Sequence, residues 1–358
     1  MPLPPRQTPT LPQKPRPIVV LAAGGIVRDA HLPAYKLAGF EVIGIYDIDL
    51  EKAERLAADF GIDRVYSSLQ EACAHDPSEV VFDVAVPAAG LMKVVKALPD
   101  GAAALLQKPF GENLEEARAL LALCRSKKLK AAVNFQLRYA PYILAARDLI
   151  EQGVIGELHD VAVRVTVYMP WHLWTFLEGI PRVEILYHSV HYVDLVRSFF
   201  GEPTGVYAKT VKHPDTEKLA STRTNIALNY GDLKRANISA NHGHNFGLKH
   251  QQSYVKWEGT KGAIKATLGL LMNYPEGEPD ALEYCTLDEE GNPSEWQSVQ
   301  LQGSWYPHAF IGTMASLMRF ADGETDELPT SVDDAFRTMA VVEASYQSDA
   351  SGGTPIPE

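Results

Sequence analysis

Three side chains in this sequence are suited to moving a proton at a reacting oxygen, namely Lys108, His191 and Tyr187. An ammonium group can hydrogen-bond such an oxygen and stabilise the negative charge that develops on it. Imidazole titrates near neutral pH, so His191 can accept a hydroxyl proton. The phenol of Tyr187 can share that contact or simply shape a pocket. Without further context, Lys108 can also be read as a surface lysine and His191 as a hydrogen-bonded core histidine.

The segment 184–200 predicts a helix that presents two of these groups. At about 100° per residue, Tyr187, His191 and Asp194 fall within a stripe of about 60°. His188 lies roughly 60° off that stripe and is a second acid–base candidate. Imidazole and carboxylate groups three residues apart also allow a metal site, but the sequence has no HExxH motif and no obvious fourth ligand. We therefore expect no metal.

A glycine-containing turn follows the first apolar run of the chain. A G-x-G-x-x-G dinucleotide fingerprint would need glycine at Ala22, Gly24 and Val27. Gly24 occupies the middle position, which lets backbone approach a pyrophosphate. Asp47 stands 23 positions further on, where a carboxylate accepts hydrogen bonds from ribose hydroxyls and repels a 2′-phosphate. The pattern favours NAD over NADP, and the alternative is a plain strand–turn–helix with a solvated aspartate.

Short apolar runs alternate with amphipathic segments through the first half of the chain. This alternation is typical of βαβ units, and right-handed crossovers then favour a doubly wound parallel sheet. After about residue 136 strand patterns dominate, which predicts an α+β second domain with one open sheet face. The expected strands are 18–23, 42–47, 80–86, 102–106 and 131–135, then 160–168, 205–211, 224–229 and 235–240.

The predicted organisation has three parts. Residues 1–16 are rich in proline and form a flexible arm. Residues 17–136 form the nucleotide-binding domain of Rossmann type. Residues 137–358 form an α+β domain for substrate binding and self-association.

Composition excludes several classes of protein. The net charge of −12 disfavours partnership with nucleic acid or an anionic membrane. Three cysteines without a CxxC pair exclude a disulfide framework and fit a reducing, cytoplasmic location. No run of 18 apolar residues is present, so we expect no membrane span.

Several short motifs together resemble the Gfo/Idh/MocA family, which is named after glucose–fructose oxidoreductase and inositol dehydrogenase. The resemblance covers nearly the whole chain past residue 16. It implies an N-terminal Rossmann domain, a C-terminal domain with an open and mainly antiparallel sheet, and NAD as cofactor. The motifs are Gly24-Gly25-Ile26, His31-Leu32-Pro33-Ala34, Asp47, Gln107-Lys108-Pro109 and Gly259-Thr260-Lys261-Gly262.

The lysine motif departs from the family pattern. Members usually carry Glu-Lys-Pro at the end of the fifth strand, whereas this chain has Gln107-Lys108-Pro109. The lysine is retained and the carboxylate before it has become a neutral amide. The resemblance implies that Lys108 meets nicotinamide and substrate, because ligands of doubly wound sheets lie at the carboxyl ends of strands.

The helical motif departs as well. The family pattern is approximately Asp-x-Gly-x-His-x-x-Asp, and His191 and Asp194 match its last two named positions. Tyr187 stands for the first Asp and Ser189 for the Gly. The resemblance implies that His191 accepts the hydroxyl proton, and it leaves open whether Tyr187 assists.

Further residues are expected to hold the cofactor or line the pocket. Flat rings beside polar tips suit the CH faces and hydroxyl edges of a sugar, although core packing or a dimer contact explains tryptophans equally well. Arg138 can donate to hydroxyls or an anion, or form a salt bridge at the domain interface. The cofactor-binding prediction is Ala23, Gly24, Gly25, Ile26, Val27, Asp47, Pro87, Gln107, Lys108, Gln136 and Trp171. The substrate-binding prediction is Lys108, Arg138, Trp171, His172, Trp174, His188, His191, Trp305 and His308.

The leading hypothesis is an NAD-dependent oxidoreductase that moves a hydride between nicotinamide and a secondary hydroxyl or keto group of a sugar or sugar derivative. One alternative is an NAD-dependent glycoside hydrolase that works by transient oxidation and elimination, for which the surplus of Tyr187, His188 and His172 would supply acid–base groups. Another is a non-catalytic ligand-binding regulator. An open sheet face with apolar residues usually needs a partner, so we expect a homodimer or homotetramer.

Overall fold

The computed structural model describes residues 2–357 and divides into two compact units. The first, which we call the nucleotide unit, comprises Thr8–Ala140 and Tyr306–Met339. The second, which we call the sheet unit, comprises 2–7, Pro141–Trp305 and 340–357. This division differs from the predicted boundary after residue 136, because residues 306–339 pack with the N-terminal half of the chain.

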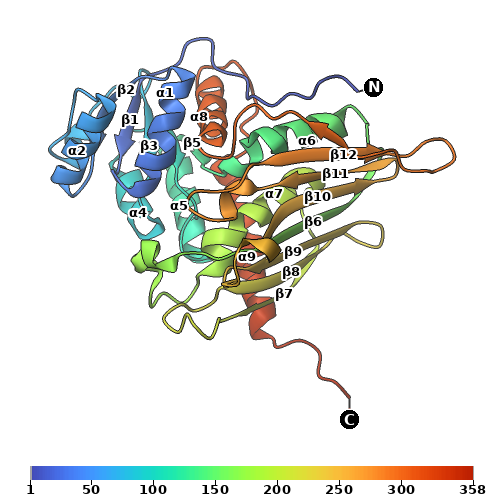
Figure 1. Cartoon of the computed structure of the whole chain (residues 1–358). Coiled ribbons are helices and arrows are strands. Elements are labelled where there is room, and N and C mark those ends of the chain that lie inside the picture. Colours follow the sequence, from blue (N-terminus) through green and yellow to red (C-terminus); the bar gives the residue numbers. More distant parts are fainter. Residues whose placement is uncertain (1, 358) are drawn as a thin grey trace. The chain divides into compact units, whose positions relative to one another are not determined.

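The nucleotide unit is built on a parallel five-stranded sheet in the order β2-β1-β3-β4-β5 (Figure 1). Its strands are nearly all apolar and mostly buried, as expected for a parallel sheet covered on both faces. The doubly wound sheet predicted from the sequence is confirmed. The strands are β1 (Ile18–Leu21), β2 (Val42–Tyr46), β3 (Val81–Val84), β4 (Ala103–Leu106) and β5 (Lys130–Val133). The helices that follow them are α1 (Leu32–Ala38), α2 (Leu50–Phe60), α3 (Leu69–Ala72), α4 (Ala88–Ala97) and α5 (Leu114–Ser126).

A helix from the far end of the sequence completes this unit. Helix α8 (His308–Ala321) contacts α1, β4 and β5, and ten of its fourteen residues are buried. The ammonium of Lys130 at the start of β5 donates to the carbonyl of Ala321 at 2.7 Å. Because α8 covers apolar strands that would otherwise face water, it belongs to the nucleotide unit despite its position in the sequence.

The sheet unit contains an eight-stranded sheet in the order β13-β12-β11-β10-β6-β9-β8-β7 (Figure 1). Neighbouring strands are antiparallel except β6 and β9, which are parallel. The predicted α+β domain with a mainly antiparallel sheet is therefore confirmed. Its strands are β6 (Leu158–Thr166), β7 (Gly205–Val211), β8 (Arg223–Asn229), β9 (Arg235–Asn241), β10 (Gln252–Gly259), β11 (Gly262–Thr267), β12 (Ala281–Thr286) and β13 (Gln297–Val299).

Helices cover one face of this sheet. Helix α6 (Pro141–Glu151) contacts β11 and β12, and α7 (Val190–Phe200) contacts β9. The last helix, α9 (Val332–Ala350), ends in this unit, where the Ser348 hydroxyl accepts from the backbone N–H of Ala208 in β7 at 2.9 Å. Alternate residues of β8 and β9 are buried, so one face of each strand faces these helices.

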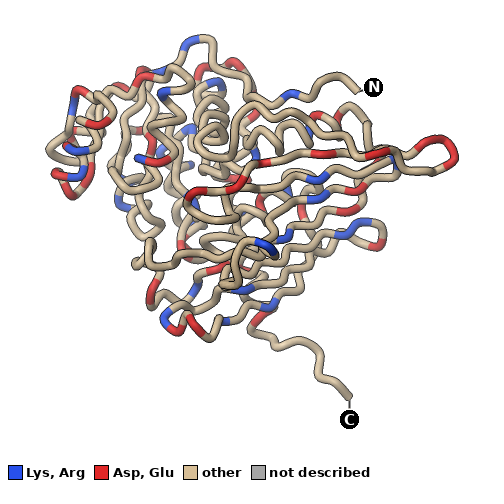
Figure 2. The backbone as a smooth tube through the Cα atoms, in the orientation of Figure 1, with Lys and Arg blue, Asp and Glu red and all other residues tan. Residues whose placement is uncertain are grey.

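The opposite face of the large sheet is polar, which differs from the apolar open face expected from the sequence. Asp160 pairs with Arg235 at 2.5 Å, and Lys265 lies 3.9 Å from Glu283 on the neighbouring strand. Figure 2 shows basic and acidic positions interspersed along these strands. Cross-strand pairs of opposite charge stabilise such a face.

The proline-rich N-terminal segment has polar partners in the structure. In the sheet unit, Arg6 binds Asp148 at 2.5 Å and Glu151 at 2.9 Å. In the nucleotide unit, Arg16 binds Asp322 at 2.5 Å. The segment is therefore not a fully solvated tail. Arg6 is held by ion pairs within the sheet unit, and Arg16 is held by an ion pair within the nucleotide unit.

Within residues 2–357, no helix combines the length and the hydropathy needed to cross a membrane.

The close fit of α8 gives a test of the fold. A Cβ added at Gly312 would lie 2.4 Å from side-chain carbons of Tyr139, in the 3₁₀ turn Gln136–Tyr139. We predict that Gly312→Ala lowers the free energy of unfolding by about 1–3 kcal/mol through overpacking, measured by urea denaturation. Gly90→Ala in α4 is the control, because its Cβ meets only the Val86 side chain at 3.3 Å. An equal effect of the two variants would contradict the packing described.

Candidate functional site

Lys108 lies two residues after β4, at the carboxyl edge of the parallel sheet. Its backbone N–H donates to Oε1 of Gln107 at 2.8 Å. The residue keeps some exposed surface, but desolvation of its ammonium lowers the pKa of Lys108 from 10.5 to about 8. A lysine with that pKa can exchange a proton near neutral pH, which an ordinary surface lysine cannot.

A buried polar network lies behind Lys108 in the same unit. His31 Nδ1 lies 2.7 Å from Oδ2 of Asp83 in β3, and the Tyr35 hydroxyl donates to the same oxygen at 2.9 Å. Nε2 of His31 lies 3.2 Å from the amide nitrogens of Gln107 and Asn134. His31 and Asp83 are each 1% exposed. The sequence analysis did not single out either residue as functional, although an aspartate inside the apolar run of β3 was a usable signal.

The turn after β1 has a geometry that fits a dinucleotide. A Cβ at Gly24 would meet no atom within 4 Å, so the backbone there is open to a ligand. Asp47, just past β2, accepts the backbone N–H of Ala23 at 2.7 Å through Oδ2 and that of Asp49 at 2.9 Å through Oδ1. These bonds place the carboxylate beside the turn, where the ribose hydroxyls of NAD would be held. Ala22 has φ 134°, a value that suits glycine, at the first glycine position of the fingerprint.

The other predicted cofactor-binding residues of the nucleotide unit lie at or near the starts of helices. Gly25, Ile26 and Val27 form the entry to a π-helical turn (Val27–His31) that leads into α1. Pro87 is the N-cap of α4, directly after β3. Gln136 is 2% exposed, and its Oε1 has no hydrogen-bond partner among the described residues. A ligand donor is one way to satisfy such a buried acceptor.

His191 lies in the first turn of α7 and is 7% exposed. Its ring lies edge-on to Trp305, with ring centroids 6.2 Å apart. The helix predicted over 184–200 is not uniform, because Glu184–Ser189 form a π-helical turn before α7 begins at Val190. The 100° spacing that put Tyr187 on one stripe with His191 therefore does not hold across that junction.

Tyr187 packs in a small apolar cluster. It contacts the buried residues Leu177, Val183 and Leu219, and its ring lies edge-on to Phe176 at 6.0 Å. These contacts favour the pocket-shaping alternative over a proton relay. The position of Tyr187 in this cluster depends on the π-helical turn, which the sequence did not predict.

A second buried polar cluster surrounds His188. Trp171 stacks on His188, with ring centroids 5.0 Å apart and an interplanar angle of 18°. His242 lies edge-on to His188 at 4.6 Å, and its Nε2 lies 3.2 Å from Glu184 Oε1. The hydroxyl of Ser189 donates to that oxygen at 2.7 Å.

Glu184 and His242 were missed as candidate site residues. Glu184 is 0% and His242 1% exposed, so the pair is fully removed from water. His242 continues the alternation of β9, in which Ala236, Ile238 and Ala240 face inward. Period-2 alternation therefore predicted a buried histidine, whereas the sequence analysis left this segment out of the site.

The remaining pocket candidates of the sheet unit lie on two loops. Trp174 packs against Tyr274 with ring centroids 5.5 Å apart, while His172 is exposed. The backbone N–H of Trp305 donates to Asp280 Oδ2 at 3.2 Å. Burial raises the pKa of Asp280, and its other oxygen accepts from the N–H of Gly269 at 2.6 Å. Asp280 thus fixes the loop that carries Trp305.

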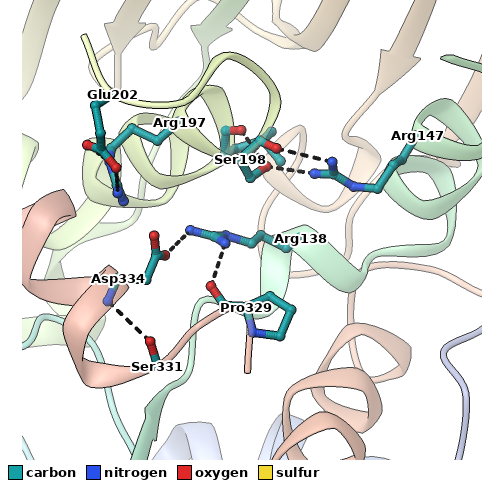
Figure 3. Close-up of polar contacts among 9 residues, drawn as sticks. Arg138, Arg147, Arg197, Ser198, Glu202, Pro329, Ser331 and Asp334 are labelled. Atoms are coloured by element: carbon teal, nitrogen blue, oxygen red, sulfur yellow. Dashed lines mark hydrogen bonds and ion pairs between the residues drawn. The ribbon is translucent and has the colours of Figure 1, made fainter. Parts of the chain in front are cut away.

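His308 and Arg138 belong to the nucleotide unit. His308 is the first residue of α8, and burial lowers its pKa below the usual 6.5. Arg138 donates to the carbonyl of Pro329 at 2.8 Å and to Asp334 Oδ2 at 2.5 Å (Figure 3). These partners hold the guanidinium within its own unit, which favours a structural role over the predicted contact with substrate.

Among residues 2–357, no group of three or more His, Cys, Asp or Glu side chains is arranged to hold a metal ion.

The predicted site residues fall into two groups, one in each unit. The nucleotide unit brings together the Gly24 turn with Asp47, and Gln107 with Lys108. The sheet unit brings together Trp171 with His188, and Trp305 with His191.

Two family models match the chain and together cover most of it. The first is described as an oxidoreductase family with an NAD-binding Rossmann fold and matches residues 17–135. The second is described as the C-terminal alpha/beta domain of the same oxidoreductase family and matches residues 147–357.

Curated relatives are similar at low identity. D-apiose dehydrogenase of Paraburkholderia graminis is 24% identical over 340 residues, which cover 90% of this chain and 85% of that protein. The 1,5-anhydro-D-fructose reductase of Ensifer adhaerens is 27% identical over 183 residues, covering 50% of this chain and 54% of that protein. Neither relative supports the glycoside hydrolase alternative.

Solved structures share the fold. An oxidoreductase from Agrobacterium radiobacter in complex with NAD+, L-tartaric acid and magnesium has a TM-score of 0.76 at 21% identity, covering 95% of this chain and 98% of that chain. The UDP-N-acetylglucosamine 3-dehydrogenase of Acidithiobacillus ferrooxidans has a TM-score of 0.71 at 17% identity, covering 94% and 98% of the two chains.

Desolvation of the Lys108 ammonium is expected to lower the free energy of unfolding while it lowers the pKa of the side chain. The pKa of Lys108 is about 8 in the folded protein and 10.5 in the reference state. The charged form therefore opposes folding below pH 8, and this cost fades as the pH rises from about 8 to 10.5. We predict that Lys108→Met raises the free energy of unfolding at pH 7 by on the order of 1–3 kcal/mol, with a smaller gain at pH 10.

Denaturation at both pH values measures this difference. The matched control is Lys96→Met, at an exposed lysine of α4, which is expected to stay within about 0.5 kcal/mol of the wild type. A Lys108→Met variant that is less stable than the wild type at pH 7 would refute the desolvation cost.

Proposed function

Because the chain belongs to the Gfo/Idh/MocA family of NAD-binding oxidoreductases, we propose that it interconverts a secondary hydroxyl and a keto group on a sugar or sugar derivative. The observation that carries the proposal is the desolvated Lys108 at the carboxyl edge of a parallel sheet. The named relatives that act on D-apiose and 1,5-anhydro-D-fructose support a carbohydrate substrate.

NAD is the cofactor, and the nucleotide unit holds it. Its pyrophosphate would lie against the open backbone at Gly24, and its ribose hydroxyls would bind Asp47. When bound, the nicotinamide accepts a hydride from the substrate carbon or returns one to it. Gln107 holds the peptide of Lys108 through its side-chain oxygen, and would do so with the cofactor bound.

Lys108 donates a hydrogen bond to the reacting oxygen and stabilises the alkoxide character that develops there. His191 accepts the hydroxyl proton during oxidation and returns it during reduction, so that one hydride and one proton leave the substrate together. Burial of its ring beside Trp305 limits competition from water. Tyr187 is proposed to shape the apolar wall near this helix, and its assistance to His191 stays a prediction.

Trp171 and His188 are proposed to form the sugar-binding surface of the sheet unit. The stacked rings present a flat apolar face, and imidazole adds a polar edge for hydroxyl groups. Four further side chains are also proposed to contact the substrate, namely Trp174, His172, Trp305 and His308. Arg138 is the weakest of the proposed contacts, because Pro329 and Asp334 already engage its guanidinium.

The activity test is a screen of polyols, aldoses and sugar acids with NAD, followed by NADH absorbance. With any substrate found, Lys108→Met and His191→Ala are each expected to lower kcat/KM by about 10²–10⁴-fold, because each removes a positioned acid–base or electrostatic group. His250→Ala, at an exposed histidine, is the control and should leave the rate unchanged. Retention of full activity by Lys108→Met would exclude the proposed mechanism.

We further propose that the protein is a cytoplasmic homodimer or homotetramer assembled through the sheet unit. Its three cysteines are all buried thiols, which fits a reducing compartment. The sheet unit exposes large apolar side chains such as Tyr207, Leu233 and Phe246, at 70%, 88% and 79% exposure. We propose that these exposed side chains contribute to contacts between copies of the chain.

Light scattering coupled to gel filtration measures the assembly. The expected molar mass is two or four times the chain mass of 39.4 kDa. A mass of 39.4 kDa across a wide range of concentrations would rule out self-association.

A further inference from the structure

The hydrogen bonds around Gln107 fix which way its side-chain amide points. A backbone N–H can only donate, so the atom of Gln107 that lies 2.8 Å from the Lys108 nitrogen must be the carbonyl oxygen Oε1. The amide nitrogen Nε2 then faces His31 Nε2 at 3.2 Å. The orientation therefore follows from chemistry and not from an arbitrary assignment of the amide.

This orientation fixes the proton on His31. Nε2 of His31 faces the N–H of Gln107 and also that of Asn134 at 3.2 Å. The Thr313 hydroxyl lies 2.8 Å from Oδ1 of Asn134 and can donate or accept, so the amide of Gln107 is the contact that fixes this proton. A ring nitrogen that receives donors must be unprotonated, so His31 is neutral and carries its proton on Nδ1.

The other side of the ring agrees with this tautomer. Nδ1 of His31 donates to Asp83 Oδ2 at 2.7 Å, and Tyr35 donates to the same oxygen at 2.9 Å. Desolvation and the charge of Asp83 raise the pKa of Tyr35 well above 10, so its hydroxyl stays a donor. Asp83 thus anchors a chain of hydrogen bonds that runs through His31 and Gln107 to the backbone of Lys108.

We propose that Gln107 is a positioning residue that ties the Lys108 peptide to the buried Asp83–His31 pair, and that its amide locks His31 in the neutral tautomer protonated on Nδ1. The pair is 1% exposed on both sides, so the anchor cannot be replaced by bulk water. The amide is the part that matters, because it accepts from Lys108 and donates to His31 at the same time.

A carboxylate at position 107 would change the buried charges. Glutamate can still accept the Lys108 N–H, but it cannot donate to His31 Nε2. His31 would then need a second proton to face it, which makes the ring a cation between two carboxylates. The residue at 107 therefore sets the charge state of His31.

Among the described residues, few titratable groups contact His31 and could change its protonation state. The titratable groups in hydrogen-bond contact with His31 or its carboxylate partner are Asp83 from β3 and Tyr35 from α1. Beyond Gln107, β5 is followed by the amide of Asn134, and α8 presents the ring of Phe310 at 5.0 Å. Lys108 lies one peptide away, through Gln107.

The direct test is ¹⁵N NMR of the full-length protein labelled at histidine, with the His31 signals assigned by their loss in His31→Gln. We expect wild-type His31 to show a protonated Nδ1 and an unprotonated Nε2 at pH 7. Gln107→Glu is expected to show both nitrogens protonated at pH 7. Wild-type protonation on Nε2 or on both nitrogens would overturn the tautomer lock, and a neutral His31 in Gln107→Glu would do the same.

A kinetic test addresses the positioning role and rests on the proposed function of Lys108, whereas the NMR test does not. Gln107→Met removes both hydrogen bonds and is expected to lower kcat about tenfold or more, with KM for NAD changed less than threefold, because the reacting group is misplaced. Gln107→Glu keeps the bond to Lys108 and should recover most of kcat. Its rate profile should stay near that of the wild type, since the proton gained by His31 offsets the negative charge of the glutamate.

Gln70→Met is the matched control, because it makes the same substitution at an exposed glutamine of α3 outside this network. It should keep His31 neutral and kcat within twofold of the wild type. Wild-type kcat in Gln107→Met would refute the positioning role, and so would a kcat in Gln107→Glu as low as that in Gln107→Met. If Gln107→Met does not fold, Gln107→Ala, which also removes both hydrogen bonds, takes its place.

Discussion

Partial desolvation of the Lys108 ammonium is the constraint on which the proposed chemistry of this protein depends. A parallel sheet delivers the ends of its strands to one edge, and the packing there partly excludes solvent from a charged group. That exclusion costs stability, and it also lowers the pKa of the lysine to about 8. The same desolvation that makes the fold less stable makes the side chain useful.

Buried polar pairs in both units make this arrangement specific. In the nucleotide unit, Asp83 and His31 lie behind Gln107, and in the sheet unit, Glu184 and His242 lie behind the Trp171–His188 stack. Within each pair, one carboxylate oxygen and one ring nitrogen lie within hydrogen-bond distance, which favours one packing over others. Each pair lies one contact away from a predicted site residue.

The sequence predicted the sheets well because their signals are local. Apolar runs such as 18–23 and alternating runs such as 205–211 carry their own pattern, and β1 and β7 follow them closely. The Gly24 turn and Asp47 were also visible, since their spacing is fixed by one strand–turn–helix unit. Strands β10 to β13 lay in a part of the chain for which no strands were predicted.

Local sequence patterns did not predict the long-range contacts or the irregular helical turn. Helix α8 packs on strands about 200 residues earlier in the chain, which no local pattern encodes. The π-helical turn Glu184–Ser189 broke the helical spacing that grouped Tyr187 with His191. Arg138 looked like a ligand for anions because its partners Pro329 and Asp334 are remote in sequence. The tautomer of His31 follows only from three-dimensional contacts.

The most direct measurement of the central claim is a calorimetric titration of the purified protein with NAD, repeated with Gly24→Val. The account predicts saturable binding of NAD by the wild type. It predicts a loss of binding in the variant, because valine fills the space that the backbone at Gly24 leaves open to the pyrophosphate. Absence of binding to NAD and NADP, in oxidised and reduced forms alike, would contradict the account.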